Sequence, residues 1–126
     1  MAGQGSALYR ILVVDDEPDL RYILRRIFER AGHEVIDASE GEAALGAVRA
    51  APPDLVVTDM MMPVMDGAEL IRRLRADPAT ARIPVLAATA DAPMAVGADL
   101  VVTKPYRSSQ ILAAADALLA PKAVDE

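Results

Sequence analysis

The sequence has 126 residues, the length of one average domain, and 53% of them are hydrophobic, which argues against a disordered chain. Its 13 Lys and Arg against 19 Asp and Glu give a net charge of −6, so nucleic acid and anionic membranes, which attract clustered positive charge, are not expected as partners. Cysteine is absent, which excludes disulfides, thiol nucleophiles and Cys-based zinc sites and permits the cytoplasmic location that we expect.

Residues 1–7 are small and polar and lack the apolar core of a signal peptide, so we expect a flexible lead there. Residues 8–120 are predicted to form one folded domain, and residues 121–126 a C-terminal tail. No apolar run approaches the ~18 residues that a membrane span needs.

Short apolar runs alternate with helical patterns along the chain, which is typical of a parallel sheet with helical crossovers. The strands are predicted at about Tyr9–Val14, Glu34–Ala38, Leu55–Thr58, Pro84–Ala88 and Leu100–Thr103. The unbroken apolar run Ile11–Val14 is typical of a strand that is buried on both faces.

Helical patterns follow four of these five strands. Pro18 suits the first turn of the first helix, and Gly32 ends it. Three starts have capping signals: Ser39 with Glu42, Asp66 with Glu69, and Ser108. The stripes expected to be buried are Leu20, Ile23, Leu24, Ile27 and Phe28 in the first helix, Leu70, Ile71 and Leu74 in the third, and Ile111, Leu112, Ala115, Leu118 and Leu119 in the last.

The crossover between the last two strands is unusual. It spans only Ala90 to Asp99 and contains Pro93. A crossover between parallel strands usually needs at least ~10–12 residues including its helix. Any helix in this crossover is therefore expected to be short and imperfect.

Hydrophilic residues stand where four of the apolar strands end, which is where open parallel sheets bind their ligands. They are Asp15 and Asp16, Asp59, Thr89 and Lys104. Two like charges ~4 Å apart cost ~4 kcal/mol at an effective dielectric of ~20, so three converging carboxylates call for a cation. Mg²⁺ prefers oxygen ligands, and a metal, an ammonium and a hydroxyl together form the electrostatic clamp of phosphoryl transfer.

These residues lie in stretches that resemble the receiver domain of the two-component response-regulator family. The matching stretches are Ile11–Pro18, Asp59–Gly67, Thr89, Gly97–Asp99 and Thr103–Tyr106. Each piece alone is a weak signal, whereas their order and spacing together are highly specific. The resemblance covers about Tyr9 to Ala120 and points to a stand-alone receiver similar to a chemotaxis protein.

The resemblance implies an α/β, flavodoxin-like three-layer sandwich. Its five-stranded parallel sheet would have the order 2-1-3-4-5, an order that a chemotaxis receiver illustrates. Thr89 and Lys104 are closer in sequence than the family usually has them, by about two helical turns. The fourth helix is therefore expected to be shortened or absent.

The family also implies a metal site and a phosphoacceptor. Asp59 resembles the phosphoacceptor, Asp16 the direct ligand of Mg²⁺ (or Mn²⁺), and Asp15 the ligand that acts through water. The backbone carbonyl of Met61 would complete the protein ligands. Read alone, the two adjacent aspartates could instead be carboxylates at the start of the first helix.

Thr89 and Lys104 would hold the phosphoryl oxygens, and Lys104-Pro105 would be a cis peptide, as in the family. In the family, an aromatic residue three positions before the lysine often rotates inward on activation, but this chain has Val101 there. Because valine is small and branched, it cannot make that swing. The switch formed by Thr89, Val101 and Pro105 is therefore expected to work differently, and the output face to be atypical.

The function that follows is Mg²⁺-dependent phosphorylation of Asp59 by a histidine kinase or a histidine phosphotransfer protein, followed by self-catalysed dephosphorylation. The chain would be a signalling element, not a metabolic enzyme. The main alternative is a non-phosphorylated receiver-like interaction module. A flavin carrier is disfavoured because Asp15 and Asp16 would repel a flavin phosphate. A phosphatase is disfavoured because Asp59-Met60-Met61 lacks the Asp-x-Asp pattern.

Other conspicuous residues have ordinary interpretations. His33 is expected to be an exposed loop residue, and Asp91 a solvated loop acid. Met62 and Met65 are expected to be partly buried, with Met61 beside the site, because methionine mostly fills gaps.

Overall fold

The fold is a five-stranded parallel sheet between two layers of helices, in a computed structural model that describes residues 9–119. The strands are β2 (Arg10–Val14), β3 (Glu34–Ala38), β4 (Leu55–Thr58), β5 (Val85–Thr89) and β6 (Leu100–Thr103). The order β3-β2-β4-β5-β6 confirms the predicted flavodoxin-like topology. The predicted lead 1–7 and tail 121–126 lie outside the described residues.

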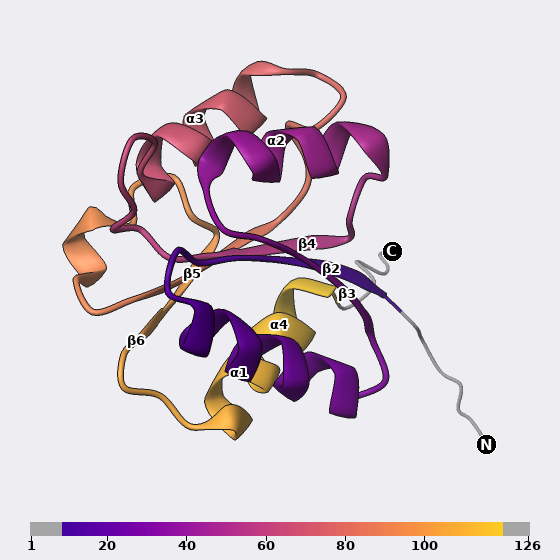
Figure 1. Cartoon of the computed structure of the whole chain (residues 1–126), viewed down its shortest axis with the longest axis vertical. Coiled ribbons are helices and arrows are strands. Elements are labelled where there is room, and N and C mark those ends of the chain that lie inside the picture. The colour runs from indigo at the N-terminus through magenta and orange to yellow at the C-terminus, as the bar shows by residue number, and fades with distance from the viewer. Residues whose placement is uncertain (1–8, 120–126) are drawn as a thin grey trace, which may run out of the picture.

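The helices are α1 (Pro18–Arg30), α2 (Gly41–Ala50), α3 (Gly67–Ala76) and α4 (Ser108–Leu119), with the 3₁₀ turn η1 (Ala92–Met94). Helices α2 and α3 cover one face of the sheet, and α1 and α4 cover the other (Figure 1). None of the described helices is long and apolar enough to cross a membrane.

The hydrophobic core has two halves because strand residues alternate between the faces of the sheet. Leu12 and Val14 of β2 pack in the half beneath α2 and α3. Ile11 and Val13 pack in the half beneath α1 and α4, where Phe28 is fully buried. The prediction that Ile11–Val14 is buried on both faces is thus confirmed, and this rigid central strand leads directly into Asp15.

Of the three predicted helix caps, the structure confirms one. The Asp66 cap is confirmed, because its Oδ1 accepts a hydrogen bond from the Glu69 N–H at 2.9 Å. The Ser39 capping box is wrong, since α2 begins at Gly41 and no side chain caps it. A side chain at Gly41 would collide with Met65, so packing places that turn. Ser108 is the first residue of α4 instead of its cap.

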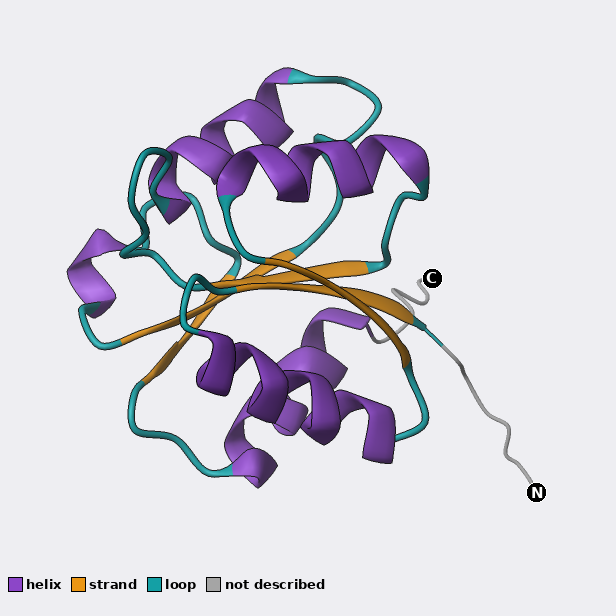
Figure 2. Cartoon of the chain, viewed as in Figure 1, coloured by secondary structure: helices purple, strands orange, loops and turns teal. Residues whose placement is uncertain are grey.

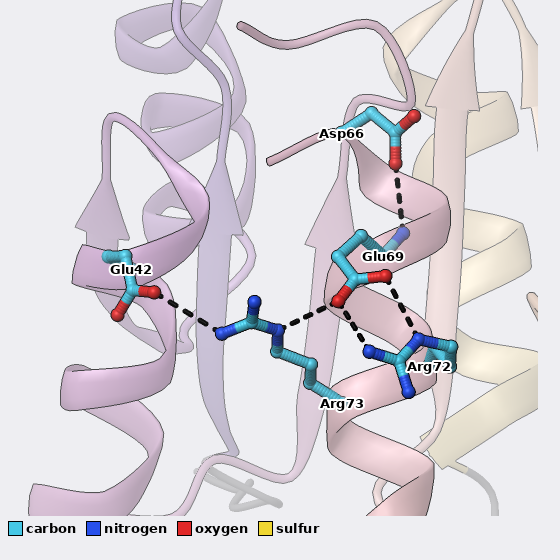
Figure 3. Close-up of polar contacts among 5 residues, drawn as sticks. All are labelled: Glu42, Asp66, Glu69, Arg72 and Arg73. Carbon is cyan, nitrogen blue, oxygen red and sulfur yellow. Dashed lines mark hydrogen bonds and ion pairs between the residues drawn. The ribbon is translucent and has the colours of Figure 1, made fainter. Parts of the chain in front are cut away.

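An ion-pair ladder joins α2 to α3 (Figure 3). Glu69 accepts hydrogen bonds from Arg72 and Arg73, and Arg73 also reaches Glu42 on α2, with Nη1 3.3 Å from Oε2. The two guanidinium groups lower the pKa of Glu69 to about 2. Because these side chains are exposed, the ladder adds little stability, but it aligns the start of α3 with its neighbour.

The crossover from β5 to β6 has only the three-residue turn η1 in place of a full helix (Figure 2), as the short spacing predicted. Arg75 anchors it by donating to the carbonyl oxygens of Ala81 at 3.0 Å and Ile83 at 2.7 Å and to the Asp99 carboxylate at 2.7 Å. Asp99 also accepts from the Val85 N–H at 2.7 Å. One arginine and one aspartate thus hold the end of the crossover against the sheet.

Four side chains differ in exposure from their predictions. His33 is half-buried, because the turn at Gly32 brings its ring near Phe28 and Tyr9, with ring centroids 6.3 and 5.7 Å away. Ile23 is 49% exposed, so the buried stripe of α1 is narrower than its apolar pattern. Met62 and Met65 are fully buried, not partly.

We predict that Arg75→Ala lowers the free energy of unfolding by about 2 kcal/mol, because hydrogen bonds to a charged group are worth roughly 1.5–3 kcal/mol each before relaxation. Urea denaturation measures the change. Arg72→Ala is the matched control, since Arg72 is an exposed arginine of the same helix. Equal stability of the wild type and Arg75→Ala would show that the crossover does not depend on this anchor.

Candidate functional site

The candidate site lies at the carboxyl ends of the parallel strands, where the predicted residues meet. Asp15 and Asp16 follow β2, and Asp59 follows β4. One carboxylate oxygen from each of the three lies within 4.8 Å of the other two. Strand order explains the convergence, because β2 and β4 are hydrogen-bonded neighbours and end in register, Val14 opposite Thr58.

Asp59 is held by the backbone of its own loop. Its Oδ1 accepts hydrogen bonds from the N–H groups of Met60 at 2.7 Å and Met61 at 3.3 Å. The Gly67 N–H donates to the Met60 carbonyl at 3.0 Å, and a Cβ on Gly67 would lie 2.6 Å from the Asp59 carbonyl oxygen. The first residue of α3 must therefore be glycine for the loop to close over Asp59. Asp59 Oδ2 makes no backbone hydrogen bond within the described residues.

Asp15 is the most buried acid of the cluster, with 1% of its surface exposed. Its Oδ1 accepts from the Glu17 N–H at 2.9 Å, whereas its buried Oδ2 has no hydrogen-bond partner among the described residues. Desolvation raises the pKa of Asp15, and the charges of Asp59 and Asp16 act in the same direction. The site therefore contains a buried carboxylate oxygen that a bound cation would stabilise.

Lys104 supplies one positive charge to this cluster. Its Nζ lies 3.6 Å from Asp15 Oδ2 and 3.5 Å from Asp59 Oδ2. Its backbone N–H donates to the Thr89 carbonyl at 2.9 Å, which fixes the end of β6 beside β5. The Lys104-Pro105 peptide is cis, as the family resemblance implied.

Thr89 is fully buried at the end of β5, and its Oγ1 accepts a hydrogen bond from the Asp91 N–H at 3.2 Å. Within the described residues, no hydrogen bond joins the Thr89 side chain to the three carboxylates. Val101, the third predicted switch residue with Thr89 and Pro105, is 38% exposed on β6. Asp91 is exposed, as predicted, and Met61 lies beside the site with 56% of its surface exposed.

Three further residues build the site and were not predicted from the sequence. Gly67 was only part of a quoted motif, although its lack of a side chain allows the loop to close. Tyr106 is half-buried, and burial together with the charges of Asp15 and Asp59 raises its pKa to about 12. Arg21 donates from Nη1 to the Asp15 carbonyl oxygen at 2.7 Å. The first two follow motif residues and could have been found, whereas nothing local marks Arg21.

The donor set fits a magnesium ion. One carboxylate oxygen from each of Asp15, Asp16 and Asp59 lies within 4.8 Å of the other two, near enough for a single octahedral Mg²⁺, whose ligand oxygens lie ~3–4 Å apart, to draw them together. All the donors are hard oxygens, and histidine and cysteine are absent from the cluster. Asp15 Oδ2, which makes no hydrogen bond within the described residues and has only Lys104 Nζ nearby at 3.6 Å, is consistent with a bound cation.

Residues 11–116 match the response regulator receiver domain family. The chain is 38% identical over 117 residues to an alkaline phosphatase synthesis transcriptional regulatory protein, PhoP, of Bacillus subtilis, covering 87% of this chain and 48% of that protein. It is 35% identical to a phosphate regulon transcriptional regulatory protein, PhoB, of Pseudomonas aeruginosa, covering 86% of this chain and 51% of that protein. The chain thus spans about half the length of these relatives.

Among solved structures, the chain resembles the chemotaxis protein CheY4 of Vibrio cholerae, with a TM-score of 0.84 and 29% identity. The match covers 90% of this chain and 100% of that chain. The structural likeness therefore extends over nearly the whole described domain.

We predict that Asp15→Asn raises the midpoint of thermal unfolding of the metal-free protein at neutral pH. A raised pKa means that the folded state binds this proton more tightly than the unfolded state. The stability from that proton is thus present below the ordinary value of 3.8 and is lost as pH rises through the raised pKa.

The variant should also lose most of the stabilisation that added Mg²⁺ gives the wild type, since bound ligand stabilises the folded state. Thermal unfolding with and without Mg²⁺ measures both effects. Asp116→Asn, which neutralises an exposed acid on α4, is the control. A lower midpoint for Asp15→Asn without metal would contradict the conclusion that the charged form of this buried carboxylate destabilises the metal-free fold.

Proposed function

Because this chain belongs to the response regulator receiver domain family, we propose that Asp59 accepts a phosphoryl group from a phosphohistidine of a histidine kinase or a phosphotransfer protein. The observation that carries this proposal is the cluster of Asp15, Asp16 and Asp59 with Lys104 Nζ at 3.5 Å from Asp59. Phosphoryl transfer to a protein needs a carboxylate nucleophile, oxygens that bind a metal ion, and a positive charge such as an ammonium group.

Asp59 Oδ2 is the proposed nucleophile. Its partner Oδ1 is engaged by two backbone N–H groups, which orient the carboxylate and leave Oδ2 facing Lys104. Oδ2 forms a bond to phosphorus as the bond from phosphorus to the histidine nitrogen breaks, and the imidazole leaves with that electron pair. Hydrolysis later restores the carboxylate when a water oxygen bonds to phosphorus and inorganic phosphate departs.

Asp16 and Asp59 would hold Mg²⁺ (or Mn²⁺) directly, with Asp15 acting through water and the Met61 carbonyl as a further ligand. The ion would supply positive charge to the phosphoryl oxygens during transfer. Support comes from the spacing within the cluster and from the unpartnered oxygen of Asp15.

Lys104 is proposed to bind one phosphoryl oxygen through its ammonium group, and Thr89 another through its hydroxyl. The Asp91 N–H already occupies an acceptor position on Thr89 Oγ1, so the hydroxyl proton stays free for donation. The chain would thus catalyse only its own phosphorylation and dephosphorylation, and it would not be an enzyme with an external product.

The output face is proposed to be atypical. Val101 stands where many receivers have an aromatic switch residue, and η1 has three residues in place of a fourth helix. Phosphotransfer does not need that helix, so we propose that it is retained while the coupling of Thr89 to an aromatic rotamer is not used. The same two features favour the second candidate, a receiver-like docking module that is never phosphorylated.

The partners of the whole protein are proposals as well, because the chain spans about half the length of PhoP and PhoB, which are transcriptional regulators by name. A phosphodonor protein is the proposed upstream partner. Action without an attached effector domain, a cytoplasmic location and the lack of a nucleic-acid partner stay predictions of the composition and the motifs.

We predict that the chain gains one phosphoryl group when incubated with Mg²⁺ and a small phosphoryl donor, and that Asp59→Asn gains none, since an amide is not a nucleophile for phosphorus. Intact mass spectrometry measures the adduct. Asp116→Asn should be phosphorylated like the wild type. A folded wild-type protein without an adduct from several donors would favour the docking module.

We predict that Lys104→Ala slows phosphorylation, whereas Asp16→Ala weakens Mg²⁺ binding. Lys104→Ala should bind Mg²⁺ at least as tightly as the wild type, because a competing cation is gone, yet accept phosphate at least about tenfold more slowly. Asp16→Ala should lose Mg²⁺ affinity first. Calorimetric titration with Mg²⁺ and rapid-quench phosphorylation separate the two. Identical profiles for both variants would contradict the assigned roles.

A further inference from the structure

Asp15 has a buried backbone carbonyl that depends on a single side chain. The residue is 1% exposed, so its carbonyl oxygen needs a hydrogen-bond partner inside the protein. The Asp15 N–H donates to the Ala38 carbonyl at 3.2 Å, which continues the pairing of β2 with β3. Within residues 9–119, the Asp15 carbonyl oxygen accepts only from Arg21, whose Nη1 lies 2.7 Å away.

The local sequence explains why no backbone group takes this place. In a four-residue turn, the carbonyl of the first residue accepts a hydrogen bond from the N–H of the fourth. Counted from Asp15, the fourth residue is Pro18, which has no N–H. Pro18 also begins α1, and side chains on a helix lean toward its N-terminus, so Arg21 can reach back to the carbonyl. The arginine thus supplies the donor that the proline lacks.

The same carbonyl belongs to the peptide that joins Asp15 to Asp16. Within the described residues, no hydrogen bond or ion pair holds the Asp16 carboxylate, although one of its oxygens lies in the cluster. In contrast, Asp59 Oδ1 accepts from two N–H groups of its own loop. The direction of the Asp16 side chain is therefore set by its backbone. Because a peptide unit is planar, the hydrogen bond from Arg21 fixes that backbone.

We propose that Arg21 is a positioning residue of the metal site, an inference that rests on the proposed binding of Mg²⁺ to Asp16 and Asp59. The guanidinium holds the peptide between Asp15 and Asp16 in the orientation that directs the Asp16 carboxylate into the cluster. Arg21 itself does not contact the metal. Removing a group that orients a metal ligand typically weakens metal binding by roughly 10–100-fold.

The charge of Arg21 makes the direction of the effect decisive. Among residues 9–119, no carboxylate lies within ion-pair distance of its guanidinium, so its positive charge is not cancelled by a partner. A positive charge beside a cation site opposes binding. Electrostatics alone thus predicts that Arg21→Ala binds Mg²⁺ more tightly, whereas loss of the positioning hydrogen bond predicts weaker binding.

Calorimetric titration of the 126-residue chain with Mg²⁺, in the absence of a phosphoryl donor, tests the proposal. Arg21→Ala should raise the Kd for Mg²⁺ by at least about tenfold. Arg21→Lys, which keeps the charge and a donor, should bind Mg²⁺ more tightly than Arg21→Ala. Arg26→Ala is the matched control, because it removes an exposed arginine of the same helix and should leave the Kd unchanged.

A second readout needs no metal. The Glu17 N–H donates to Asp15 Oδ1 at 2.9 Å and so closes the turn that Arg21 holds. Hydrogen exchange at the Glu17 amide should be several-fold faster in metal-free Arg21→Ala than in the wild type. The Glu69 amide, which donates to Asp66 Oδ1 at the start of α3, is the internal control and should exchange equally in both proteins.

Failure of this inference and failure of the proposed function are visible separately. A wild type that binds no Mg²⁺ would overturn the proposed metal site and the role of Arg21 together. A wild type that binds Mg²⁺, with Arg21→Ala binding it as tightly or more tightly, would overturn the role of Arg21 alone. Equal acceleration of exchange at Glu17 and Glu69 would show a general loss of stability and would also overturn this role. Phosphoryl uptake by Asp59 enters none of these measurements.

Discussion

The crowding of carboxylates at one edge of a parallel sheet is the constraint on which the rest of this structure depends. Asp15, Asp16 and Asp59 lie within 4.8 Å of one another, and Lys104 alone offers them a positive charge at short range in the described structure. Such a cluster is costly, and a strand buried on both faces leads into the most buried of these acids. A cation bound by these acids would thus meet carboxylates that the fold already holds close together.

The backbone provides that preparation. The carboxylate of Asp59 is oriented by two N–H groups of its own loop, and the loop closes because Gly67 has no side chain. Asp66 caps α3 one residue earlier, and the ladder through Glu69 aligns this helix with α2. Capping, close approach and side-chain alignment therefore converge on the orientation of one carboxylate.

The short crossover between β5 and β6 also determines how the edge of the sheet is built. Arg75 and Asp99 anchor a crossover that has no full helix, so β6 keeps its register with β5 and Lys104 reaches the site. Because no full helix packs there, the Val101 side chain is 38% exposed. The position of Lys104 at the carboxyl end of β6 and the exposure of Val101 within β6 are thus two consequences of one short segment.

The sequence by itself determined the elements whose signals are local. Continuous apolar runs such as Ile11–Val14 identified the strands, and the strand order together with the acids at their ends followed from the family motifs. The Asp66 cap was predictable because its acceptor and donor are three residues apart. The start of α2 was not, because contact between Gly41 and Met65, distant in sequence, decides it.

Only the tertiary structure decided what is buried and what is left without a partner. The half-buried ring of His33, the contact of Arg21 with the Asp15 backbone and the unpartnered Oδ2 of Asp15 all arise between segments that the fold brings together. The exposure of Val101 likewise depends on what does not pack against β6. Hydrogen-bond partners and solvent exposure are properties of an assembled surface, whereas periodicity and capping are written within a few neighbouring residues.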